Sequence, residues 1–265
     1  MLMEERTQEQ LVASHFEELS RSWSDRYASA LTFQQYNFIA RRDGVLELFD
    51  KTGGTYLDAG CGTGDFIPGL LERGGTVIAM DLSCGMIEQT RARVRSLPAG
   101  QVQFAVGDVT RLGYRDECFD AIIGVGLLEY LSDVGAAFQE MRRTLKPGGI
   151  LIVTVPNLAS PFMAYETFVS HVKKSMALAR ALVRRQPRPR TFRHRRFIPW
   201  RLDRALHRSG FEKVDATFCT YGLFASKRLS PFFLRVSRRL APHSRSPAGV
   251  LGTNYIVKAR KPCDG

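Results

Sequence analysis

Residues 55–66 read Thr55-Tyr-Leu-Asp-Ala-Gly60-Cys-Gly62-Thr-Gly64-Asp-Phe66, with three glycines at every second position. The glycines follow a short run of β-type residues and precede a helical pattern. Glycine is needed where a strand turns sharply into a helix, and where the backbone approaches a ligand more closely than a side chain allows. This stretch therefore predicts a cofactor-binding loop. A nicotinamide dinucleotide site prefers Gly-x-Gly-x-x-Gly, whose sixth position is Asp65 here, so the pattern disfavours a dehydrogenase.

Short apolar runs alternate with longer helical patterns after this loop, as in βα units around a parallel sheet. Glycine and proline at 74–75, 98–100 and 146–149 mark helix ends, each just before an apolar run. A helical stretch rich in aromatic residues, 15–49, precedes the sheet, and we expect it to pack across the carboxyl edge of the strands. A further helix is predicted at 199–210. The predicted strands are 55–59, 76–80, 102–106, 119–124, 150–155, 212–220 and 254–260.

Acidic residues close the second and third predicted strands, Asp81 and Asp108 respectively. A carboxylate after the second strand suits the hydroxyls of a ribose. One after the third suits the exocyclic amine of adenine, because the carboxylate accepts hydrogen bonds that the amine donates. Any one of these aspartates, taken alone, is better explained as the cap of the following helix. Together with Asp58, which we expect to be partly buried and to accept from the backbone or a cationic amine, they favour a nucleotide-like ligand.

Four stretches resemble the motifs of class I S-adenosylmethionine-dependent methyltransferases, especially the small-molecule branch that includes the ubiquinone and menaquinone biosynthesis enzymes. They are LDAGCGTG at 57–64, DLSCGMI at 81–87, the segment 107–120, and LKPGGILIVTVPN at 145–157. They occur in order and cover about half of the chain. The resemblance implies an α/β fold with a Rossmann-like, seven-stranded, mostly parallel sheet. Its last strand would be antiparallel, with helices on both faces and helical lid insertions.

The resemblance also implies S-adenosyl-L-methionine as the cofactor. The glycines would line its methionine portion, Asp81 its ribose, Asp108 and Val109 its adenine, and Val125 would face its sulfur. The predicted cofactor-binding set is Asp58, Gly60, Cys61, Gly62, Thr63, Gly64, Asp81, Leu82, Met86, Asp108, Val109 and Val125, and no metal site is predicted. We expect one methyltransferase domain over 1–265. Its parts are a helical cap at 1–50, a cofactor-binding core at 51–157 and a basic helical insertion at 158–198. The rest of the sheet follows at 199–265, with a second basic insertion at 222–252.

Methyl transfer from a donor that already carries a positive sulfur needs alignment and a dry pocket. An oxygen acceptor also needs a group that removes its proton. The sequence does not identify that catalytic group: Tyr27, Tyr130 and His171 are candidates, and packing explains the two tyrosines better than catalysis does. Tyr130 stands where quinone-type relatives often have histidine. His194 and His207 fit a basic or exposed surface better.

The net charge of +12 is concentrated late in the chain. Residues 157–252 hold 20 lysines and arginines against four acidic residues. Within 165–185, apolar residues fall on one helical stripe with the cations off it, which is the pattern of an amphipathic basic helix. A shorter copy of this pattern occurs at 233–240.

Three explanations of the basic segment remain open. In the first explanation, its helices cover the acceptor pocket and rest on an anionic membrane, where each Lys or Arg near the surface contributes about 1 kcal/mol to binding. Alternatively, the segment binds RNA through phosphates, or it forms ordinary lid helices whose apolar stripe lies in the core. RNA is disfavoured because the segment lacks regularly interleaved aromatic residues and any recognised RNA-binding module.

The sequence therefore predicts a cytoplasmic methyltransferase that acts on a small or lipid-linked metabolite, with oxygen as the expected acceptor atom. Peripheral contact with the inner face of the membrane belongs to the first explanation above. An RNA methyltransferase and a non-catalytic nucleotide-binding protein are the alternatives, and the oligomeric state is not specified.

The polar, acidic N-terminus and the lack of a long apolar run argue against secretion and a transmembrane helix. Five cysteines without a Cys-x-x-Cys pair argue against a disulfide framework or zinc site.

Overall fold

The computed structural model describes residues 7–23, 32–97, 100–183, 194–223 and 229–263. Its strands form one seven-stranded sheet in the order β3-β2-β1-β4-β5-β7-β6. Neighbouring strands are parallel except that β7 runs antiparallel to both β5 and β6. The strands are β1 Gly54–Ala59, β2 Gly75–Asp81, β3 Val102–Val106, β4 Phe119–Val125, β5 Leu145–Pro156, β6 Glu212–Cys219 and β7 Asn254–Arg260. The predicted α/β class and the antiparallel last strand are confirmed.

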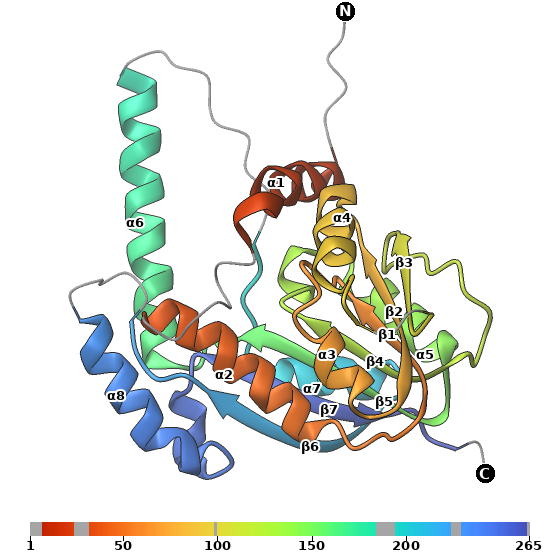
Figure 1. Ribbon diagram of the computed structural model, residues 1–265. Helices are drawn as coiled ribbons and strands as arrows, with labels where there is room; N and C mark the ends of the chain where they lie inside the picture. Colours follow the sequence, from red (N-terminus) through yellow and green to blue (C-terminus); the bar gives the residue numbers. More distant parts are fainter. Residues whose placement is uncertain (1–6, 24–31, 98–99, 184–193, 224–228, 264–265) are drawn as a thin grey trace, which may run out of the picture.

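Helices cover both faces of the sheet (Figure 1). One face packs against α2, α3 and α4, and the other against α5 and α7. Because the central strands are buried on both faces, they appear in the sequence as continuous apolar runs rather than as alternating patterns. The helices are α1 Gln8–Trp23, α2 Phe33–Leu48, α3 Ile67–Leu71, α4 Cys84–Arg93, α5 Val134–Thr144, α6 Pro161–Val183, α7 Pro199–Arg208 and α8 Ser230–Leu240, with short 3-10 turns η2 Leu128–Tyr130, η3 Ala241–His243 and η4 Pro247–Leu251.

Strand β5 begins earlier than the predicted 150–155. It starts at Leu145, and its pairing with β4 shifts register between Phe119 and Ala121. Gly148 adopts φ +72° within this irregularity. The Pro-Gly-Gly sequence, taken as a helix end, therefore also makes a bulge at the start of the strand, since glycine accepts the conformation that a bulge requires.

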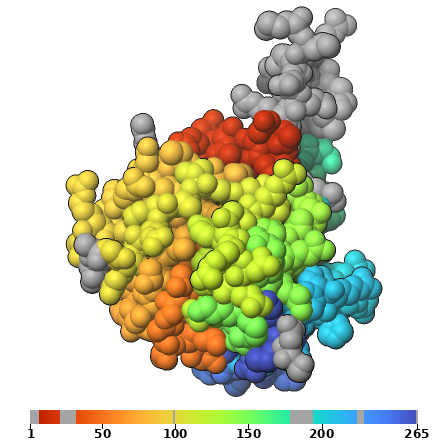
Figure 2. All heavy atoms as spheres, turned by 90° about the vertical axis from the view of Figure 1, so that its right-hand side faces the viewer, coloured from red at the N-terminus to blue at the C-terminus, as the bar shows by residue number. Residues whose placement is uncertain are grey.

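The aromatic-rich stretch forms α1 and α2, which occupy different places. Helix α1 crosses the carboxyl edge of the sheet as predicted, because Gln8 Nε2 donates to Tyr130 O at 3.0 Å and Glu17 accepts from Gly85 N at 2.9 Å. Figures 1 and 2 show α1 lying beside α4. Helix α2 does not cross this edge as predicted: it packs on a face of the sheet against β6, β7 and α8, and only some of its side chains, among them Phe38 and Arg41, reach the cavity at the edge.

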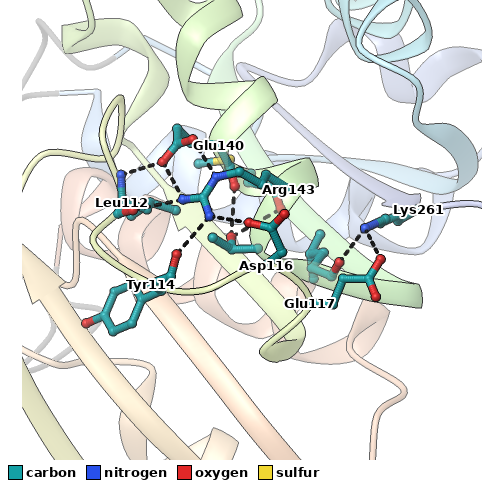
Figure 3. Close-up of polar contacts among 10 residues, drawn as sticks. Leu112, Tyr114, Asp116, Glu117, Glu140, Arg143 and Lys261 are labelled. Carbon is teal, nitrogen blue, oxygen red and sulfur yellow. Dashed lines mark hydrogen bonds and ion pairs between the residues drawn. The ribbon is translucent and has the colours of Figure 1, made fainter.

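Arg143 on α5 holds the end of the loop between β3 and β4 (Figure 3). Its guanidinium donates to the carbonyl oxygens of Leu112 and Tyr114 at 2.9 and 2.8 Å and pairs with Asp116 at 2.6 Å. The loop begins at the carboxyl edge, where Asp108 lies. These contacts therefore anchor the segment that carries one of the predicted ligand-binding carboxylates.

Candidate functional site

The glycine loop folds back onto the end of β2. The N–H groups of Gly60 and Cys61 both donate to Met80 O, at 2.8 and 2.9 Å. Gly60, Gly62 and Gly64 have φ of 71°, 55° and 75°, the left-handed region that favours glycine. A β-carbon on Gly60 would lie 3.1 Å from Leu127 Cδ1. The loop therefore presents bare backbone, as a close approach to a ligand requires.

Asp81 ties this loop to helix α4. Its two carboxylate oxygens accept from Gly62 N and Ser83 N, both at 2.9 Å. Ser83 in turn caps α4 by accepting from Met86 N at 3.1 Å. Burial raises the pKa of Asp81, and the hydrogen bonds from backbone N–H groups oppose that rise. The position of the loop and the start of α4 thus depend on one carboxylate.

Two further carboxyls lie at the glycine loop. Asp65 accepts from Thr63 Oγ1 at 2.7 Å and forms an ion pair with Arg93. Asp58 is fully buried, and its Oδ2 has no hydrogen-bond partner in the described part of the chain. Desolvation, and then the charges of Asp81 and Asp65, raise the pKa of Asp58 to about 8. The charges of Asp81 and Asp65, which help to raise this pKa, also favour a cationic ligand at the loop.

Asp58→Asn is expected to flatten the pH dependence of stability. The pKa of Asp58 is about 8 in the folded chain and about 4 in an unfolded one, so the folded state holds this proton more tightly between these values. Stability is therefore lost as pH rises from 4 towards 8, by up to about 1.4 kcal/mol per pH unit from this group. Urea unfolding of both proteins across this range measures the two slopes. Parallel slopes would contradict the raised pKa.

A cavity of about 410 Å³ extends along the carboxyl edge of the sheet from this loop. Its size lies in the range of small-molecule sites, about 300 to 1,000 Å³. Asp58, Thr63 and Gly64 support the loop and do not line the cavity. The predicted cofactor residues that line it are Gly60, Cys61, Gly62, Asp81, Leu82, Met86, Asp108, Val109 and Val125.

The other end of the cavity is lined by charged and aromatic side chains from separate elements. They are Arg41 of α2, Glu129 and Tyr130 of η2, and His194 and Arg196 of the segment before α7. Glu129 is only 3% exposed. Desolvation raises its pKa to about 7, although the charges of Arg41 and Arg196 act in the opposite direction. This end therefore combines a carboxyl that titrates near neutrality with two cations.

The three candidate catalytic residues occupy different positions. Tyr130 lines the cavity and packs edge-on against Phe16 and His194, with ring centroids 5.0 Å apart in both pairs. His171 is exposed on α6, its Nδ1 lies 2.8 Å from Thr167 O, and it does not line the cavity. Tyr27 lies outside the described residues.

Sequence reasoning placed His194 on a basic surface; the residue is exposed, and it also lines the cavity, which the sequence did not indicate. Sequence reasoning also missed Glu129, Arg41 and Arg196. The one signal for Glu129 is a single acidic residue inside the apolar run that follows β4. Nothing in the local sequence marks the two arginines, because they reach the cavity from distant parts of the chain.

The comparisons with known proteins agree with this geometry. A family model described as a methyltransferase domain matches residues 57–153. Demethylmenaquinone methyltransferase of Bacillus velezensis is 30% identical over 151 residues, which are 55% of this chain and 63% of that protein. Residues 57–153 therefore form a domain of the class I S-adenosylmethionine-dependent methyltransferase superfamily. The chain spans only 33 to 63% of the length of the first curated relatives that it matches.

Solved structures share the superfamily fold. Magnesium protoporphyrin IX methyltransferase from Synechocystis, with bound S-adenosylhomocysteine, aligns over 96% of this chain and 100% of its own, with a TM-score of 0.65 and 16% identity. The [4+2]-cyclase SpnF aligns over 98% of both chains with a TM-score of 0.65 and 20% identity. At these identities the likeness shows the fold alone.

S-adenosylmethionine is the cofactor of this superfamily, and the residues present suit it. The bare glycine loop allows close approach, and the charges of Asp81 and Asp65, which raise the pKa of the unpartnered Asp58, also favour the positive charge of a sulfonium. Within the described ranges, no group of histidine, cysteine, aspartate and glutamate side chains has the arrangement of a metal site.

Proposed function

We propose that this chain transfers the methyl group of S-adenosylmethionine to an oxygen atom of a small or lipid-linked molecule. The observation that carries the proposal is that the glycine loop, the strand-end carboxylates and the charged group around Glu129 all line one cavity. A methyl donor held at the first end and an acceptor held at the second would lie in one enclosed space. Enclosure excludes water and aligns the two reactants, which is what a displacement at carbon requires.

Each part of the cofactor has a proposed partner. Asp81 would accept hydrogen bonds from the ribose hydroxyls, and Asp108 would accept one from the adenine amine, with Val109 against the ring. Gly60 and Gly62 would contact the methionine portion through their backbone, and Val125 would lie near the sulfur. When bound, the cofactor supplies an activated methyl group on a positive sulfur.

The relatives support a small-molecule acceptor. One of them acts on demethylmenaquinone by name, and a structural neighbour methylates magnesium protoporphyrin IX by name. SpnF shows that the same fold also serves a cyclase, so a direct assay of methyl transfer is needed.

The test is to incubate the purified chain with methyl-labelled S-adenosylmethionine and either the small-molecule extract or the total RNA of its source cells. Label in an extractable small molecule, with stoichiometric S-adenosylhomocysteine, is the expected result. Label in RNA would support the RNA alternative. Binding of S-adenosylhomocysteine by calorimetry without any transfer would support the non-catalytic alternative.

We further propose that the protein docks on an anionic membrane through α6 and α8. The apolar stripe of α6 is exposed, with Phe168 67% and Met176 51% accessible, and Lys173 and Lys174 are exposed beside it. This contradicts the explanation in which the stripe lies in the core. Figure 1 shows α6 projecting from the body. Exposed aromatic and basic side chains on one helix match the interface and the charge of an anionic bilayer.

The position of these helices suits a lipid-linked acceptor. Their first turns meet where Phe162 packs edge-on against Phe233, with centroids 6.0 Å apart, and the adjacent Met163 lines the cavity. In the described part of the chain no helix combines the length and the apolarity needed to cross a bilayer. The docking proposed here is therefore peripheral.

Phe168→Glu is expected to reduce binding to phosphatidylglycerol vesicles about tenfold or more, because burying a phenylalanine side chain contributes about 1.5 to 3 kcal/mol. Co-sedimentation at low and high salt measures the binding. Val214→Glu adds the same charge at an exposed position on β6 and serves as the control. Equal binding of both variants, or wild-type binding that is absent or insensitive to salt, would exclude the docking.

A further inference from the structure

Glu129 is a buried carboxyl that makes none of the proposed contacts with the cofactor. It lies four residues beyond Val125, the end of β4, and lines the cavity. Its Oε2 has no hydrogen-bond partner among the described residues. Buried carboxylate oxygens are normally hydrogen-bonded, because leaving one without a partner costs free energy. An oxygen left this way at a cavity wall indicates a bound partner that completes it.

The backbone around Glu129 is held in place from three sides. Gly126 N donates to Thr154 Oγ1 at 3.0 Å on β5, and Tyr130 N donates to Leu127 O at 3.1 Å. The Glu129 carbonyl accepts from Arg195 N at 2.7 Å. The carboxyl is therefore carried by a rigid turn rather than by a free loop, which a group that acts on a reacting atom requires.

Charged and titratable groups from several elements line the cavity together with Glu129, and the charges of Arg41 and Arg196 act on it directly. Arg41 comes from α2, Arg196 and His194 from the segment before α7, and Tyr130 from η2 itself. Glu9 comes from α1, where its carboxylate accepts from the Ser132 hydroxyl. The two guanidiniums favour an ionised Glu129 and also any negative oxygen that forms beside it.

We propose that Glu129 removes the proton from a hydroxyl group of the acceptor. This inference rests on the proposed methyl transfer and names its acceptor as a hydroxyl carried on an apolar body, since Phe38 beside Arg41 and Met163 beside Arg196 also line the cavity. Oε2 takes the hydroxyl proton, and the acceptor oxygen bonds to the methyl carbon. The bond from that carbon to sulfur breaks and its electron pair stays on sulfur. Glu129 gives the proton to solvent after the product leaves.

The test compares wild type with Glu129→Gln, which keeps the size of the side chain and cannot take the proton. Methyl transfer to the small-molecule extract of the source cells is measured across pH 5 to 9, with S-adenosylhomocysteine affinity measured by calorimetry. Wild-type transfer is expected to rise with pH and to be half-maximal near pH 7, where Glu129 titrates. The variant is expected to keep its affinity, to lose about 10² to 10⁴-fold in rate, and to lose this rise.

Glu166→Gln is the matched control. Like Glu129, Glu166 carries a charge that raises the pKa of Arg196, but it lies on α6 and does not line the cavity. This variant is therefore expected to keep the wild-type rate and pH profile. If Glu129→Gln retains the wild-type rate and profile, or if Glu166→Gln loses as much, the assignment is overturned while the proposed methyl transfer stands. If wild type labels nothing in the extract, the proposed function fails and the role of Glu129 fails with it.

Discussion

Asp81→Ala is expected to bind S-adenosylhomocysteine about 100-fold more weakly than wild type, because each hydrogen bond to a charged group contributes about 1.5 to 3 kcal/mol. The substitution removes the proposed ribose contact. It also removes the acceptor of the hydrogen bonds from Gly62 N and Ser83 N, both 2.9 Å long, so the glycine loop and the start of α4 lose their common anchor. Isothermal titration calorimetry measures the affinity.

Two further variants separate these contributions. Asp81→Asn keeps the shape and one accepting oxygen, and we expect an intermediate affinity. Asp43→Ala removes an exposed aspartate outside the cavity, paired with Arg42, and is expected to bind like wild type. An Asp81→Ala protein with wild-type affinity would remove Asp81 from the proposed cofactor site.

The central sheet and the glycine loop could be predicted from the sequence because their signals are local. Strands buried on both faces appear as short apolar runs, and Gly60, Gly62 and Gly64 stand together in the chain. Asp81 and Asp108 follow from the same logic, since the carboxyl ends of parallel strands meet at one edge of a sheet. The shared edge places them along one cavity although 26 positions separate them in the sequence.

The acceptor end could not be predicted because it is assembled from separate elements. Arg41, Glu129 and Arg196 come from a helix, a 3-10 turn and an irregular segment. Each one alone fits a surface charge, and only the tertiary packing of α2, η2 and the segment before α7 brings them together. The spacing of residues predicts which side chains are neighbours on one helix or strand. It does not predict which side chains from different elements meet in the folded chain.

Helix α6 shows a second limit of sequence reasoning. The periodicity of Tyr165, Phe168, Val172 and Met176 identifies an apolar stripe, but a stripe is equally compatible with burial in a core and with a partner surface. The structure distinguishes these alternatives because all four side chains are exposed. Periodicity thus predicts which side of a helix is apolar, whereas tertiary packing determines whether that side is covered.

Gly64→Ala is expected to lower the free energy of unfolding by about 2 to 5 kcal/mol, of which backbone strain contributes about 1 to 2 and steric overlap about 1 to 3. Gly64 has φ +75°, and a β-carbon there would lie 2.7 Å from Thr90 Cγ2 and 3.0 Å from Ile67 Cδ1. Thr90 is fully buried, and its hydroxyl donates to Gly62 O at 2.7 Å. Displacing Thr90 would therefore disturb the cofactor loop, so S-adenosylhomocysteine affinity is expected to fall as well.

Gly53→Ala provides the control for backbone strain. Gly53 has a similar φ of +70°, and a β-carbon there meets nothing within 4 Å, so this variant is expected to lose only the strain contribution and to keep its ligand affinity. The double variant Gly64→Ala with Thr90→Ser removes the clashing methyl while keeping the hydroxyl, and it should recover part of both losses. Urea unfolding and calorimetry on the three proteins measure these effects. If Gly64→Ala loses no more stability than Gly53→Ala, packing against α4 does not constrain the loop, and only the requirement for left-handed backbone accounts for Gly64.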